Sequence, residues 1–280
     1  MRGRPPHRSS GHRRRWHNGV PGYRVVMRFL LHAWWLQVKQ LSLGRLQQFS
    51  ALIQPAVMAT IAYLIFRHSR AETVQEVVLG AGLLGMWSAA LFGSGAAISR
   101  QRAMGLLEGL VGAPMPLPLS VLPITVAAAT IGLYSMAATF LWCELLFGFS
   151  VSLAHPALVP VCAVVTVLTL GVTGLLLSAL FFLYPSSQSL ASMMEFPIAL
   201  LSGVLVPVSA LPSVIRPLSW ILAPMWSIRA LQAAVGGGRP IVFPLLMCAG
   251  LSVLYVLAAV GLLRSLVDRS RAKARLALTT

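Results

Sequence analysis

Residues 157–184, ALVPVCAVVTVLTLGVTGLLLSALFFLY, contain no charged side chain. A helix rises 1.5 Å per residue, so about 20 apolar residues cross the roughly 30 Å hydrocarbon layer of a bilayer. This segment is therefore long enough to span a membrane as one helix. The rest of the chain is similar, since 57% of its 280 residues are hydrophobic and 10% are charged. Soluble domains carry about 25% charged residues, so the composition argues against a water-soluble fold.

Five further apolar segments predict an all-α membrane protein with six transmembrane helices in one domain, residues 23–265. The predicted spans are residues 49–66, 77–98, 119–147, 157–184, 190–206 and 243–263. Pro55 is expected to kink the first span. The second span is rich in glycines, which are expected to let another helix approach closely: Gly80, Gly82, Gly85, Gly93 and Gly95.

The segment before the first span divides into two parts. Residues 1–22 are rich in Arg, His, Pro, Gly and Ser, a composition that predicts a disordered cytoplasmic tail. Tyr23–Leu46 places apolar residues at helical spacing among cations, which predicts an amphipathic entry helix on the cytoplasmic membrane surface. Packing on another part of the protein is the alternative. The residues that we expect to serve this entry helix are Arg28, Trp34 and Lys39.

Two other segments lie outside the apolar spans. Residues 207–240 contain repeated prolines and two tryptophans, and they predict short re-entrant helices between the fifth and sixth spans. Residues 266–280 form a basic C-terminal cytoplasmic tail. Irregular backbone at membrane depth needs protein or water around it, so the re-entrant helices are expected to be covered.

The distribution of Lys and Arg predicts the orientation of the chain. Placing the N-terminus inside puts 17 of the 22 cations in the cytoplasm. The other five fall outside: Arg67, Arg70, Arg216, Arg229 and Arg239. An even number of spans then leaves both termini in the cytoplasm, and we expect a multi-pass protein of a bacterial cytoplasmic membrane. This orientation explains the net charge of +16 better than nucleic-acid binding does, because the cations cluster beside apolar spans.

Side chains that could carry bond chemistry are scarce. The chain has six acidic residues, and it contains no HExxH motif, no GxSxG elbow and no paired intramembrane aspartates. Its three cysteines have no paired spacing, so a metal site or disulfide framework is not indicated. We therefore predict a protein that is not an enzyme, with no catalytic, cofactor-binding or metal-binding residue.

Two ionisable residues fall within the predicted spans, where burial is costly unless the side chain faces water or a partner. Glu144 lies near the outer end of the third span, and interfacial solvation would explain it. Glu195 lies near the cytoplasmic start of the fifth span, and the positive end of the helix dipole would explain it. A functional role stays open for both. Neither position is deep enough for a typical proton-coupled antiporter, which disfavours a secondary transporter.

The segment Ser99–Pro114, SRQRAMGLLEGLVGAP, follows the second span on the cytoplasmic side. Its charged residues can be solvated while its leucines form an apolar edge, which predicts a short amphipathic helix suited to a protein groove. A simple interfacial turn is the alternative. The residues expected to make this contact are Arg100, Arg102, Gly105, Leu106, Leu107, Glu108 and Pro114.

At this segment the sequence resembles the type-2 family of ATP-binding-cassette (ABC) transporter permeases. Members of that family carry Gly-Thr-Leu-Glu-x-Leu and a proline after the second span. Gly105, Leu107, Glu108, Leu110 and Pro114 match, while Leu106 replaces the usual threonine. A second set matches the signature of the fifth span in order and spacing: Ser202, Gly203, Pro207, Leu211, Pro212, Leu218, Ser219, Pro224 and Arg229. The resemblance covers residues 24–265.

The resemblance implies a homo- or heterodimer of six-span subunits, each bound to a separate cytoplasmic ATPase that holds ATP and magnesium. In such a protein the entry helix and the segment at Arg100 would transmit closure of the ATPase. The short helices between the fifth and sixth spans would form an outer gate. Its expected residues are Ser202, Gly203, Pro207, Leu211, Pro212, Pro224 and Arg229.

The function implied is export of an amphipathic drug-, antibiotic- or lipid-like substrate through the dimer interface, by alternating access of rigid bodies. The expected substrate path includes Gln54, Thr60, Trp87, Ser88 and Met193. The alternatives are a polysaccharide or glycolipid exporter of the same family, a secondary transporter, and a membrane scaffold that transports nothing.

Overall fold

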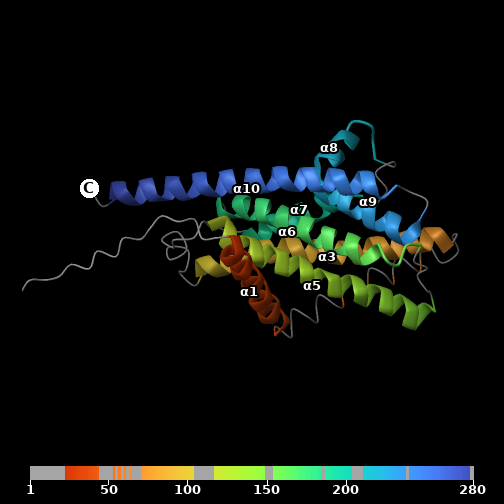
Figure 1. Ribbon diagram of the computed structural model, residues 1–280. Helices are drawn as coiled ribbons and strands as arrows, with labels where there is room; N and C mark the ends of the chain where they lie inside the picture. Colours follow the sequence, from red (N-terminus) through yellow and green to blue (C-terminus); the bar gives the residue numbers. More distant parts are fainter. Residues whose placement is uncertain are drawn as a thin grey trace, which may run out of the picture.

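A computed structural model of the chain describes residues 23–43, 71–103, 117–148, 154–183, 187–203, 211–237 and 240–277, together with positions 53, 56, 57, 60 and 64. Every regular element within these residues is a helix (Figure 1). The helices are α1 (Tyr23–Ser42), α3 (Ala71–Ala103), α5 (Leu117–Phe147), α6 (Val159–Leu183), α7 (Ser187–Leu201), α8 (Arg216–Ile221), α9 (Ala223–Gly236) and α10 (Val242–Ala277). The all-α prediction is therefore confirmed for the described part of the chain.

Three of these helices contain stretches long and apolar enough to cross a membrane: Leu117–Leu146 in α5, Val159–Phe181 in α6 and Val242–Leu266 in α10. Two helices contain shorter apolar stretches: Val78–Ser94 in α3 and Ser189–Leu201 in α7. The predicted first span and its kink at Pro55 lie almost wholly outside the described residues. The count of six spans therefore stays a prediction.

Several helices differ in length from the apolar segments that predicted them. α3 begins at Ala71 instead of residue 77, and α10 continues to Ala277 instead of ending at residue 263. The added residues include Ala, Glu, Arg and Lys, which are strong helix formers, so the helices continue beyond the apolar residues. α7 ends at Leu201, before the predicted residue 206, and Gly203 follows with φ of 79°. A glycine in this left-handed conformation is a common helix terminator.

The long helices form a bundle (Figure 1). α5 packs against α3 and α6, and α6 packs against α10. The C-terminal ends of α3 and α10 and the N-terminal end of α5 point toward the same end of the bundle, while α8 and α9 lie toward the other end (Figure 1). α1 lies across α5 at a steep angle to the bundle axis.

Glycines and small residues bring the central helices close together. A Cβ atom at Gly132 of α5 would lie 2.7 Å from the Cα of Met86 in α3. At Gly171 of α6 it would lie 2.9 Å from the Cα of Val126 in α5. In α3, Gly82 faces Met136 and Gly93 faces Ala128. The predicted role of glycines in close helix approach is therefore confirmed at Gly82 and Gly93.

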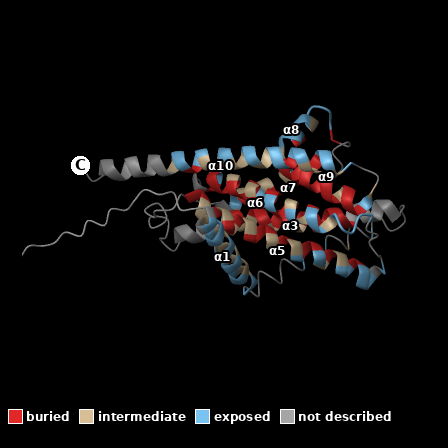
Figure 2. Ribbon diagram, viewed as in Figure 1, coloured by how far each residue is buried: buried red, intermediate tan, exposed pale blue. Residues whose placement is uncertain are grey.

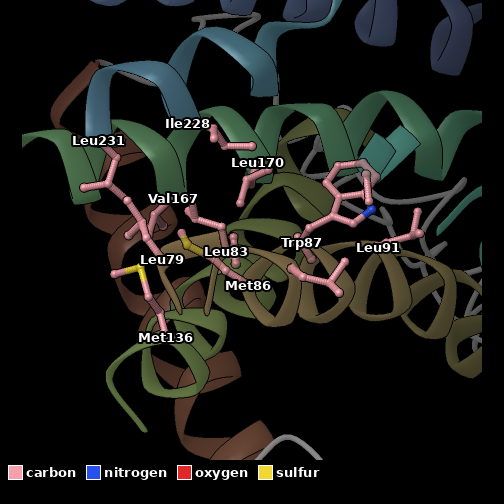
Figure 3. Packing of buried hydrophobic residues seen from close by; sticks show 14 of the residues in the cluster. Leu79, Leu83, Met86, Trp87, Leu91, Met136, Val167, Leu170, Ile228 and Leu231 are labelled. Carbon is pink, nitrogen blue, oxygen red and sulfur yellow. The ribbon is translucent and has the colours of Figure 1, made fainter. Parts of the chain in front are cut away.

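The main apolar cluster fills the space between α3, α5, α6, α7 and α9. Trp87 and Met86 of α3 are fully buried there, together with Leu170 of α6 and Ile228 of α9 (Figure 3). Helices from distant parts of the sequence therefore share one core. α9 lies within that core, because 11 of its 14 residues are buried.

Many side chains on the outer faces of the bundle are exposed (Figure 2), and large apolar residues are common among them. The exposed side chains of α10 include Leu246, Val253, Leu254, Leu257 and Leu262. Monomeric soluble proteins rarely expose a continuous apolar surface of this kind, and a hydrocarbon environment accounts for it.

Replacing Gly132 by alanine should destabilise the bundle, because the new methyl group would overlap the backbone of Met86. Overpacking of this kind costs about 1–3 kcal/mol. Gly250→Ala is the matched control, since no atom lies within 4 Å of a Cβ at that position of α10. The thermal midpoint of the purified protein in detergent should fall for Gly132→Ala alone. Equal midpoints for the two variants would contradict the proposed close packing of α3 and α5.

Candidate functional site

The expected entry helix, α1, packs on the bundle along one side. The indole N–H of Trp34 donates a hydrogen bond to the hydroxyl of Thr130 in α5, at 3.1 Å. Arg28 and Lys39 are exposed on the other side, next to the exposed ring of Trp35. The alternative of packing on the protein is therefore correct for Trp34. Arg28 and Lys39 keep the exposure that a helix at a membrane surface or a partner requires.

The predicted coupling segment needs a correction at its start. Arg100 and Arg102 lie in the last turns of α3, which continues without a break to Ala103, so no separate helix begins at Ser99. The two arginines therefore belong to the end of a long helix and not to the start of a short one. The other predicted residues lie outside the described part of the chain: Gly105, Leu106, Leu107, Glu108 and Pro114.

Two of the expected path residues meet an acidic side chain inside the bundle. The hydroxyl of Ser88 in α3 donates a hydrogen bond to the carboxyl group of Glu195 in α7. The indole N–H of Trp87 donates to the backbone carbonyl of Glu195 at 3.2 Å. All three side chains are buried. α3 and α7 are therefore joined by polar contacts within an apolar core.

The other expected path residues do not join this cluster. Met193 is 75% exposed and lies on the opposite side of α7 from Glu195. The hydroxyl of Thr60 accepts a hydrogen bond from the indole N–H of Trp142 in α5 at 3.1 Å. Gln54 lies outside the described residues. The five residues thus do not form one continuous lining in the described part of a single subunit.

The structure overturns the explanation of Glu195 by the helix dipole. α7 begins at Ser187, so Glu195 is two turns into the helix, and the dipole effect falls off within the first turn. The contact with Ser88 buries the carboxyl group in the core of the bundle. Its depth in a membrane stays a prediction. Glu144, by contrast, is exposed near the end of α5, which agrees with interfacial solvation.

The residues of the expected outer gate lie on three separate stretches of chain. Ser202 is buried after α7 and donates to the carbonyl of Ile198 at 2.7 Å. Leu211 is buried while Pro212 is exposed. Pro224 and Arg229 belong to α9, and the guanidinium group of Arg229 lies 5.4 Å from the centroid of the Trp226 ring. Pro207 lies outside the described residues.

A break in the helix between α8 and α9 is the most unusual backbone feature of this region. Leu222 adopts an extended conformation, with φ of −79° and ψ of 112°, and it separates Ile221 from Ala223. Pro224 has no N–H, so it cannot bond the carbonyl of Trp220 as a continuous helix would. Such a break leaves several backbone groups in need of other partners.

Side chains of α9 and α10 supply partners for three of these groups. The indole N–H of Trp226 donates to the carbonyl of Trp220 at 3.0 Å. The hydroxyl of Tyr255 in α10 donates to the carbonyl of Ile221 at 3.0 Å and accepts from the N–H of Ala223 at 3.4 Å. One phenol can do both, because it is a donor and an acceptor.

The start of α9 is also packed on α10. The rings of Trp226 and Phe243 meet edge to face, with their centroids 5.6 Å apart. Met225 and Trp226 share a buried cluster with Leu211 and with Cys248 of α10. The thiol of Cys248 lies 2.8 Å from the hydroxyl of Thr169 in α6. This cluster joins α9, α10 and the chain before α8.

The far end of α9 is fixed by backbone hydrogen bonds. The N–H groups of Ala154 and His155 donate to the carbonyls of Val235 and Ala234, at 3.0 and 3.1 Å. Gly237 then turns the chain with φ of 72°, and a Cβ atom there would lie 2.9 Å from Ala154. α9 is therefore anchored at both ends.

The sequence did not identify Thr130 or Tyr255 as important residues, and it missed the partners of Glu195 and Trp226. The signal for Glu195 was present, because an ionisable residue in an apolar segment suggests a function by default. Nothing in the sequence pairs Tyr255 with residues 221–223, since that contact joins segments more than 30 positions apart. Within the described helices, no three His, Cys, Asp or Glu side chains gather as metal ligands would.

Comparison with protein families gives one match. The family model described as ABC-2 type transporter matches residues 29–235. The matched range includes most of α1, all of α3, α5, α6, α7 and α8, and nearly all of α9. A search of curated proteins finds no match for this chain.

Replacing Ser88 by alanine should lower the thermal midpoint, because the carboxyl group of Glu195 would stay buried without this donor. Stranding a buried polar group costs about 1–3 kcal/mol. Ser265→Ala is the matched control, since that hydroxyl bonds the Gly261 carbonyl at 2.9 Å from an exposed position. The control should unfold at the wild-type temperature in detergent. A loss of equal size in both variants would show that the contact with Glu195 is unimportant.

Proposed function

Because this chain belongs to the ABC-2 type transporter family, we propose that it is the permease subunit of an ATP-driven exporter in a bacterial cytoplasmic membrane. The family match over residues 29–235 is the observation that carries the proposal. The chain is an ABC transporter membrane subunit, and its apolar helices agree with a multi-pass protein. The energy source, the substrate and the partners of this subunit are proposals.

An ATPase partner is proposed because permeases of the ABC-2 type transporter family normally work with one. Its docking site would lie at the end of the bundle where α3 ends and α5 begins. Arg100 and Arg102 are in the last turns of α3 at that end, and the basic end of α10 points the same way (Figure 1). Short cytoplasmic segments are enriched in Lys and Arg. The position of the two basic helix ends at the same end of the bundle therefore supports a cytoplasmic location for that end.

The proposed mode of transport is alternating access by a dimer of such subunits. Tight packing of α3, α5 and α6 through glycines supports movement of these helices as one body. The exposed side of α7 offers a surface for a second subunit, with Met193 and Phe196 both more than half exposed. The buried side of the same helix carries Glu195. α7 would thus connect the subunit interface to the core.

The proposed substrate is an amphipathic drug-, antibiotic- or lipid-like molecule. The apolar outer surface of the bundle supports entry from the membrane, because a membrane-soluble molecule can reach it directly. Ser88 and Glu195 are polar groups at the buried side of α7, and they could bind a donor group on the substrate once the helices separate. Export is proposed from the family resemblance alone.

The coupling proposal predicts that changing Leu106, Leu107 and Glu108 together to alanine abolishes copurification with the cognate ABC ATPase. These residues carry the motif that resembles the family's coupling segment. A matched control exists, because Glu144, Leu145 and Leu146 have the same composition at the opposite end of α5, where all three are exposed. The triple alanine control should bind the ATPase normally. Unaltered assembly and ATP turnover in the first variant would refute the coupling role.

Proton-driven transport is a second candidate, and the burial of Glu195 among apolar helices favours it. Buried carboxyl groups in membrane bundles commonly serve in proton relays. Transport into vesicles distinguishes the two candidates, since an ABC exporter requires ATP and continues when a protonophore removes the proton gradient. Transport that depends on the proton gradient and is lost in the Glu195→Gln variant would refute the ATP-driven proposal.

A further inference from the structure

The break between α8 and α9 lies deep within the membrane-spanning part of the protein. Its partner Tyr255 is 13 positions after Val242 and 11 before Leu266, the ends of the apolar stretch of α10. At 1.5 Å per residue these separations are about 20 and 16 Å. Side chains on a helix lean toward its N-terminus, so the break lies somewhat nearer to Val242 than Tyr255 does, and still well inside the span.

Backbone groups at this depth have no bulk water to bond. An unsatisfied N–H or C=O group in hydrocarbon costs several kcal/mol, so irregular backbone is tolerated only where protein or a water-filled cavity satisfies it. The hydroxyl of Tyr255 does this for two groups at once, the carbonyl of Ile221 and the N–H of Ala223. Both bonds are lost together if the break moves away from α10.

The helices on the two sides of the break are held very differently. α9 is buried and is fixed at its far end by the N–H groups of Ala154 and His155. In α8, the side chains of Leu218, Trp220 and Ile221 are all more than half exposed. Only Ser219 of α8 is buried, and the indole of Trp226 bonds the carbonyl of Trp220, so turning α8 about Leu222 disturbs far less packing than moving α9 would.

We infer that Tyr255 is the latch of the outer gate: its hydroxyl holds the α8–α9 break against α10, and release of both hydrogen bonds lets α8 swing about Leu222. Tyr255 is a positioning residue, since it acts through the backbone of the break. The assignment of this segment to an outer gate rests on the proposed function. Water that enters an opening pathway would replace both hydrogen bonds, which makes release possible during transport and costly at rest.

The native thiol of Cys248 reports on this latch. It is fully buried in the cluster that Leu211, in the chain before α8, shares with Met225 and Trp226 of α9, so displacement of α8 would uncover it. Opening of the break should admit water and a small maleimide to this thiol. In a Cys143→Ala/Cys162→Ala background, Cys248 is the single cysteine, because the chain has three. Tyr255→Phe should raise its labelling rate by roughly tenfold, since the equilibrium population of the open form sets the rate.

Two controls separate the latch from general loosening. Tyr134→Phe removes the same hydroxyl from an exposed position of α5 and should leave Cys248 labelling unchanged. Cys143, buried in α5, should keep its slow labelling when Tyr255→Phe is placed in a Cys162→Ala/Cys248→Ala background. An unchanged rate at Cys248, or an equal rise at Cys143, would overturn the inference.

Hydrogen exchange of the unmodified protein gives a second test that needs no variant. Amides of residues 218–223 should exchange at least tenfold faster than those of residues 228–235, because the latch opens while α9 stays packed. Equal protection across both segments would contradict the latch.

These measurements need neither ATPase nor substrate, so they can fail or succeed independently of the proposed function. If the function is correct as well, ATP should accelerate Cys248 labelling in the assembled wild-type complex. A nucleotide effect that is absent while the Tyr255→Phe effect is present would reject the ATP-driven function and keep the latch.

Discussion

A bilayer offers no water to the backbone, so every N–H and C=O group within it must bond inside the protein. Long helices meet this requirement by themselves, and the break at Leu222 does not. Trp226 and Tyr255 bond the groups that the break leaves open. The same requirement explains why the hydroxyls of Thr166, Thr169 and Thr173 bond carbonyls one turn earlier in α6. Many buried polar side chains of the described helices bond backbone groups or join two helices.

Close packing gives the subunit the rigidity that alternating access needs. Glycines let α3, α5 and α6 meet nearly backbone to backbone, and a large shift at any one contact would create overlap. Movement is therefore expected at α7 and at the α8–α9 break, where polar contacts between helices add to the apolar packing. The buried pair of Ser88 and Glu195 and the bonds of Tyr255 are contacts of this kind.

The class of fold could be predicted from sequence because it depends on local patterns. Uncharged runs such as residues 157–184 correspond to membrane-length helices, and the prolines of residues 207–240 marked the short helices α8 and α9. Helix ends were predicted less well. Hydropathy reports where apolar residues stop, whereas α3 and α10 continue through polar residues that favour helix.

The site was predicted only in part, since its contacts join distant segments. Trp87 and Ser88 were expected to matter, but their partner Glu195 was attributed to the helix dipole, because its distance from the helix start was misjudged. Tyr255 has no local pattern to distinguish it. Its role depends on the position of α10 beside the break, which is a property of the packed bundle.

The central claim is that the chain crosses the membrane with the α3–α5 connection and both termini on the cytoplasmic side. Single cysteines in an otherwise cysteine-free protein can be placed at Glu108, at Ser152, at Arg239 and after Thr280, and labelled in intact cells with a membrane-impermeant reagent. The account predicts labelling from outside at positions 152 and 239, and protection at 108 and at the C-terminus until the cells are opened. Labelling of positions 108 and 239 from the same side would contradict it.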